Sequence, residues 1–140
     1  MEKTSISKVS LQWKWVIITF FMYVILYPIP LFVAHYALAE KTVEVFVGMW
    51  FFAGIIIIAA LAGYLSEGVT LWEPAIAGAA FIALSTITAS ILTRKTAIPF
   101  VQSFLQIVFT VFFFFLLSLL GAWLGERAQR LWKKEQTIGA

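Results

Sequence analysis

Four apolar stretches, each about the length of a membrane span, follow one another along the chain and are separated by short polar turns. A hydrocarbon core about 30 Å thick needs about 20 residues of helix, because an α-helix rises about 1.5 Å per residue. The stretches cover residues 13–36, 45–66, 73–92 and 99–124. This pattern predicts an all-α integral membrane protein in which residues 1–140 form a single domain of four transmembrane helices.

The composition of the chain supports this class. Hydrophobic residues make up 62% of the sequence, charged residues make up 12%, and the mean hydropathy is +0.96. A soluble core in a chain of 140 residues has no room for that much apolar surface. Lipid is therefore the expected solvent for most of the side chains.

Few residues are suited to catalysis or metal binding. The chain has no cysteine, and His35 is its only histidine. A metal or haem ligand at His35 is one interpretation, but a single histidine without cysteine or aspartate favours an interfacial polar role. No nucleophile–base pair, phosphate-binding glycine loop or nucleic-acid patch is present. We expect no enzymatic activity, no metal, no cofactor and no nucleic-acid partner.

The first stretch contains two prolines, Pro28 and Pro30. Each removes a backbone donor and crowds the carbonyl group four residues earlier, at Val24 and Leu26. A helix that stopped at Tyr27 would be too short to span a bilayer, so we expect the helix to continue past a kink. Broken helices sometimes mark transport sites, and proline kinks are also ordinary packing devices in membranes.

Three acidic residues lie at the ends of the apolar stretches: Glu67 and Glu73 flank a turn at Gly68, and Glu126 follows the fourth stretch. Because the residue before a proline avoids the helical region, Glu73 is expected as a helix cap and Pro74 as the first helical residue. Acids at membrane depth are functional candidates, so Glu67 and Glu73 form a candidate proton or cation site. The alternative is a structural role at the helix ends, within reach of headgroup water.

The third stretch is rich in small residues, which allow membrane helices to approach closely. We expect this helix to be the central one, packed through Ala75, Gly78, Ala79 and Ala83. Polar side chains recur at helical spacing in the second half of this stretch and in the first half of the fourth. They are Thr86, Ser90, Gln102, Gln106 and Thr110. They are expected to hydrogen-bond between the helices, either to hold them together or to form a polar pathway.

The C-terminal segment is basic and amphipathic over residues 124–135. Its cations are Arg127, Arg130, Lys133 and Lys134, which we expect to contact anionic lipid headgroups. Seven basic residues lie on the side of the two tails, against Lys41, Arg94 and Lys95 on the other side. This asymmetry predicts cytoplasmic termini.

The chain also shows a possible internal duplication. A shift of 59 positions places AGYLSE (62–67) on GAWLGE (121–126) and Trp13 on Trp72. The repeated unit would be a helical hairpin.

Three hypotheses on function follow. The first is a non-enzymatic integral membrane subunit that packs into a larger membrane complex or a homo-oligomer, because bulky aromatic residues surround a small-residue helix. The second is a small dimeric transporter or channel that uses Glu67 and Glu73. In length and helix count the chain resembles the small multidrug transporters, but it has no acid between Lys14 and Glu40, where that family has its glutamate. The third is a lipid-binding membrane organiser that uses the basic C-terminal helix.

Overall fold

The computed structural model describes residues 11–66, 71–92 and 100–139, and within them it contains only helices and their connections. The helices are α1 (Trp13–Leu26), α2 (Pro28–Ala37), α3 (Glu40–Leu65), α4 (Trp72–Leu92) and α5 (Phe100–Ile138). Four helical segments of the described residues are long and apolar enough to cross a membrane, when α1 and α2 count as one run. The prediction of an all-α protein with four apolar spans is confirmed, and these spans indicate a multi-pass membrane protein.

The two prolines of the first span lie at the start of α2. Tyr27, between α1 and α2, has helical backbone angles (φ −64°, ψ −43°), and its N–H donates to the carbonyl group of Tyr23. Pro28 is the first residue of α2, a position where the N–H has no partner within the helix. The run from Trp13 to Ala37 therefore contains 25 residues, which is long enough to span the bilayer.

The ends of the helices differ from those expected from hydropathy. α3 begins at Glu40, five residues before the predicted stretch, because a first turn tolerates acids near the positive end of the helix. α4 begins at Trp72, so the expectation that Glu73 is the cap and Pro74 the first helical residue is wrong. Both residues lie inside the first turn, where the backbone N–H groups have no helical partner and a proline removes nothing.

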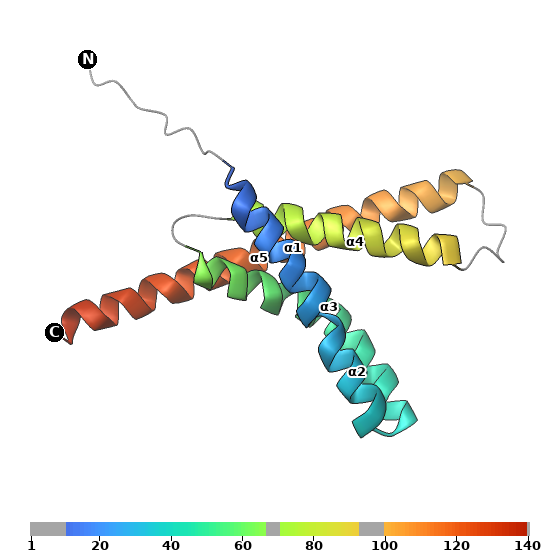
Figure 1. Cartoon of the computed structure of the whole chain (residues 1–140), viewed down its shortest axis with the longest axis horizontal. Coiled ribbons are helices and arrows are strands. Elements are labelled where there is room, and N and C mark those ends of the chain that lie inside the picture. Colours follow the sequence, from blue (N-terminus) through green and yellow to red (C-terminus); the bar gives the residue numbers. More distant parts are fainter. Residues whose placement is uncertain (1–10, 67–70, 93–99, 140) are drawn as a thin grey trace, which may run out of the picture.

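The helices form two hairpins that cross (Figure 1). One hairpin is made by α1 and α2 with α3, and the other by α4 with α5. Near the crossing the second half of α3 lies along the middle of α5, and α1 lies against α4. Away from it, α2 with the start of α3 diverges from the end of α4 with the start of α5, and the C-terminal part of α5 extends beyond the other helices. The crossing is therefore the place where all spans meet.

The buried core lies at this crossing. Its largest side chains include Tyr23, Ile55, Ile58 and Phe114, which come from α1, α3 and α5. The α3–α5 pair has the most extensive contact, followed by α4–α5 and α1–α4. The small-residue helix α4 is thus packed between α1 and α5, while the closest partner of α5 is α3.

Candidate functional site

A polar cluster joins the four spans at the crossing. Ser118 Oγ of α5 lies 2.9 Å from Tyr23 Oη of α1, and Tyr23 Oη donates to the carbonyl oxygen of Ile55 in α3 at 3.2 Å. Since Tyr23 has a single hydroxyl proton, Ser118 is the donor to Tyr23 in this arrangement. Tyr23 and Ser118 are fully buried. Gly78 of α4 completes the cluster, because a methyl group there would overlap the Ser118 hydroxyl and lie 3.2 Å from Tyr23 Oη.

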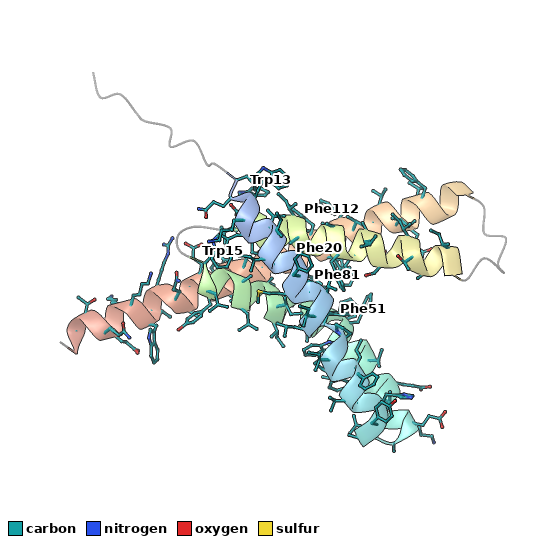
Figure 2. The ribbon with its side chains drawn as sticks, viewed as in Figure 1. Trp13, Trp15, Phe20, Phe51, Phe81 and Phe112 are labelled. Carbon is teal, nitrogen blue, oxygen red and sulfur yellow. The ribbon has the colours of Figure 1, made fainter. Side chains whose placement is uncertain are left out.

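Aromatic rings surround this polar cluster. Figure 2 shows Phe20, Phe81 and Phe51 along the crossing, from α1, α4 and α3. The ring of Tyr23 stacks on that of Phe81 at 5.5 Å between centroids, and Phe51 meets Phe114 edge to face at 4.8 Å. Such pairs add about 0.5–1.5 kcal/mol beyond the burial of their area. The hydroxyl groups of the cluster are thereby kept away from lipid.

The α3–α5 contact is made by small residues and allows the two backbones to touch. A methyl group at Gly121 would lie 3.0 Å from Ile56 Cα, and one at Gly125 would lie 2.9 Å from Ala60 Cα. Gly63 has the same role on α3, where a methyl group would lie 3.1 Å from Ala122 Cα of α5. Gly121 and Gly125 form a GxxxG sequence, the spacing typical of close helix crossings in membranes.

The junction between α1 and α2 is hydrogen-bonded to α3 in both directions. The indole Nε1 of Trp50 donates to the carbonyl oxygen of Tyr27 at 2.9 Å, and the Tyr27 hydroxyl donates to the carbonyl oxygen of Phe51 at 3.4 Å. Trp50 therefore supplies a hydrogen-bond donor to the carbonyl group directly before the first proline.

Glu73 is buried and holds the starts of α1 and α4 together. Only 3% of its surface is exposed, and its Oε1 accepts a hydrogen bond of 2.9 Å from the backbone N–H of Gln12. Gln12 is the N-cap residue of α1. The carboxylate therefore lies near the positive ends of two helices, where a negative charge is stabilised.

Glu126 is buried on α5 and forms an ion pair with Arg130, one turn later. One residue earlier than Arg130, Gln129 Nε2 donates to the carbonyl oxygens of Tyr64 at 2.8 Å and Ser66 at 3.0 Å. This side chain satisfies carbonyl groups at the C-terminal end of α3 that have no partner within the helix. The first turns of the C-terminal extension are thus attached to α3.

The remaining predicted residues have different surroundings. Ala75 is buried in α4, while Ala79 and Ala83 are half-buried. Thr86 donates to the carbonyl oxygen of Ile82 in its own helix. Gln106 is exposed and Thr110 half-buried, and neither hydrogen-bonds to a described side chain of α4.

Some predicted residues lack a described side chain or a described position. Glu67, the other member of the predicted Glu67–Glu73 pair, lies outside the described residues. The side chains of Ser90 and Gln102 also lie outside the described part. Lys133 and Lys134 are exposed on α5. Across residues 11–66, 71–92 and 100–139, no three His, Cys, Asp or Glu side chains come together as a metal site would require.

Sequence reasoning identified Gly78 as a packing position but missed Tyr23 and Ser118 of the polar cluster and the glycines of the α3–α5 contact. Tyr23 and Ser118 are isolated polar residues within apolar stretches, and nothing in their spacing shows that they meet. The GxxxG sequence of α5 was a readable signal, although it does not name the partner helix.

No protein family, curated protein or solved structure matches the chain.

Proposed function

We propose that this protein is a non-enzymatic integral membrane subunit that assembles into a larger membrane complex or a homo-oligomer. The observation that carries the proposal is the use of the interior polar groups. Tyr23 and Ser118 hydrogen-bond to each other, Tyr23 also donates to the carbonyl oxygen of Ile55 in α3, and Glu73 accepts the Gln12 N–H. These contacts hold helices together, whereas a transport site requires groups that are free to exchange partners with a substrate.

The outer surface supports assembly. The outer surfaces of the two hairpins carry bulky apolar side chains that no other part of the described chain covers. They include Phe32, Tyr36, Met49, Phe104, Phe109 and Phe112. Aromatic residues and Met are enriched at protein interfaces. Lipid or neighbouring subunits are the partners that fit such surfaces.

Extraction of the tagged protein from its native membrane in a mild detergent tests this proposal. Mass measurement of the intact complex is expected to show further subunits or several copies of the chain. Phe109→Ala is expected to reduce this association, while Ile138→Ala is the matched control, because the two side chains are 72% and 76% exposed and Ile138 lies far from Phe109, at the C-terminal end of α5. A stable monomer without partners would contradict the proposal.

A small dimeric transporter or channel is the second candidate, because Glu73 is a buried acid at a span. The hydroxyl of Thr19 in α1 is also buried and has no hydrogen-bond partner among the described residues. Reconstituted protein is then expected to support a proton or cation flux that Glu67→Gln and Glu73→Gln reduce. Absence of flux, or flux unchanged by both substitutions, would reject this candidate.

The finer features of the fold belong to the same proposal. We infer that the first span bends at Tyr27, that the termini are cytoplasmic, and that the two hairpins descend from one duplicated unit. A shift of 59 relates α1 to α4 and α3 to α5, and these are pairs that pack together. Gly63 and Ala122 are equivalent under this shift and touch each other. Such a contact is expected near the axis of two parallel repeats.

A further inference from the structure

A pocket of about 390 Å³ lies beside the region where α5 passes the end of α3. Its walls are Leu71, just before α4, and four residues of α5: Trp123, Glu126, Arg127 and Arg130. The spacing of these four residues places them on one face of the helix. The volume falls within the range of about 300–1,000 Å³ that is usual for small-molecule sites.

The two arginines of the pocket have different partners. The guanidinium group of Arg127 lies over the ring of Trp123, with its Cζ 5.4 Å from the ring centroid. Arg130 pairs with Glu126, which is 7% exposed. The described lining residues contain two guanidinium groups and one carboxylate, which sum to one net positive charge, and among them Arg127 is the cation without a carboxylate partner.

The part of α5 that lines the pocket is attached to α3. Gln129, on the same turns of α5, is anchored to the carbonyl oxygens of Tyr64 and Ser66 at the end of α3. The exposed Lys133 and Lys134 lie one turn further along α5 and do not line the pocket. A general attraction of the C-terminal helix to anions would involve these lysines equally, whereas the pocket singles out the arginines.

We propose that this pocket binds the phosphate group of one anionic phospholipid. Arginine presents a planar set of donors that matches phosphate oxygens, and its charge strengthens those hydrogen bonds. Trp123 and Leu71 supply apolar walls beside the charged groups, and tryptophan near the end of a span is typical of the headgroup layer. Free inorganic phosphate has the same chemistry, so the experiment must separate the two sources.

The test uses the full chain in detergent and native mass spectrometry. Phosphatidylglycerol, phosphatidylcholine and inorganic phosphate are titrated separately. We expect one phosphatidylglycerol per chain, bound more tightly than phosphatidylcholine, and no displacement by millimolar phosphate. Binding of inorganic phosphate with the same stoichiometry, and its displacement of the lipid, would assign the pocket to free phosphate instead.

Variants on one helix distinguish the pocket from general charge attraction. Arg127→Gln is expected to weaken phosphatidylglycerol binding about tenfold, since hydrogen bonds to charged groups are the strong ones. Lys134→Gln removes the same charge outside the pocket and is expected to leave binding unchanged. Glu126→Gln removes the negative charge that pairs with Arg130 but keeps an oxygen that can accept its hydrogen bond. Phosphatidylglycerol binding is therefore expected to become about threefold tighter.

The proposal is overturned by equal losses in Arg127→Gln and Lys134→Gln, or by weaker binding in Glu126→Gln at unchanged thermal stability. Should Glu126→Gln lower the thermal stability, the comparison of Arg127→Gln with Lys134→Gln decides alone, because both of these side chains are exposed. This result does not depend on whether the protein is a subunit or a transporter.

Discussion

The two pairs of helices that meet at the crossing are held together in different ways. In the α3–α5 pair the backbones touch, because Gly121, Gly125 and Gly63 leave no side chain between them. In the α1–α4 pair the contact is made by side chains: Tyr23 stacks on Phe81, and Glu73 accepts the Gln12 N–H. Lipid supplies no hydrophobic force between helices, so close packing of the backbones dominates in the α3–α5 pair, while side-chain packing and hydrogen bonding act together in the α1–α4 pair. The difference predicts which substitutions each pair tolerates.

Gly125→Leu is expected to have the largest effect, because the added side chain would collide with the backbone of Ala60, which cannot move aside as a side chain can. We expect a loss of at least about 3 kcal/mol in the free energy of unfolding, at or beyond the upper end for overpacked interiors. Unfolding with SDS, followed by circular dichroism, measures it. Gly48→Leu is the control, since a Cβ at Gly48 meets nothing within 4 Å. Equal effects of the two substitutions would remove the basis for a close α3–α5 contact.

Gly78→Ala is expected to cost about 1–3 kcal/mol, because the methyl group overlaps the Ser118 hydroxyl. The same unfolding assay applies. In a Ser118→Gly background, the cost of Gly78→Ala is expected to fall to less than half, since the overlapping atoms are gone. A cost that is the same in both backgrounds would show that Gly78 does not face Ser118.

Trp50→Phe removes the donor to the Tyr27 carbonyl oxygen while keeping a ring in place. The expected loss is about 1 kcal/mol, within the range of hydrogen bonds between membrane helices. Trp132→Phe serves as the control, because Trp132 is 56% exposed on the C-terminal extension. A Trp50 variant as stable as this control would contradict a stabilising role for the hydrogen bond at the α1–α2 junction.

The Tyr23–Ser118 hydrogen bond is measured by a double-mutant cycle of Tyr23→Phe and Ser118→Ala. The expected coupling energy is about 0.6 kcal/mol, the average for hydrogen bonds between membrane helices. Each single substitution also leaves a buried polar group with fewer partners, so only the coupling reports the bond itself. A coupling energy of zero would mean that the two hydroxyl groups do not interact.

The smallest effect is expected for Glu73→Gln, which keeps an acceptor for the Gln12 N–H but removes the charge near two helix N-termini. A loss of about 0.5 kcal/mol is expected. Glu44→Gln, at an exposed acid of α3, is expected to be neutral. Stability that rises in Glu73→Gln would contradict a stabilising role for the carboxylate near the two helix N-termini.

The sequence by itself determined the class, the number of spans and most of their extent. Hydropathy acts residue by residue, because each apolar side chain gains by leaving water whichever neighbour it meets. A separate argument, from the small residues of 73–92, predicted packing positions that include Gly78. Hydropathy placed the start of α3 at residue 45 and not at Glu40, because the first turn of this helix is polar and therefore leaves no apolar signal.

Only the tertiary structure decided which helices meet. Tyr23, Ile55 and Ser118 are separated by 32 to 95 positions, and their hydrogen bonds depend on a crossing that no local pattern encodes. The GxxxG sequence of α5, which sequence reasoning missed, is a signal of close approach but does not identify α3 as the partner. Glu73 was recognised as an acid at a helix start, but its acceptance of the Gln12 N–H required α1 and α4 to begin side by side. Which helices pair depends on their arrangement in space, and spans of similar apolar composition do not determine that arrangement.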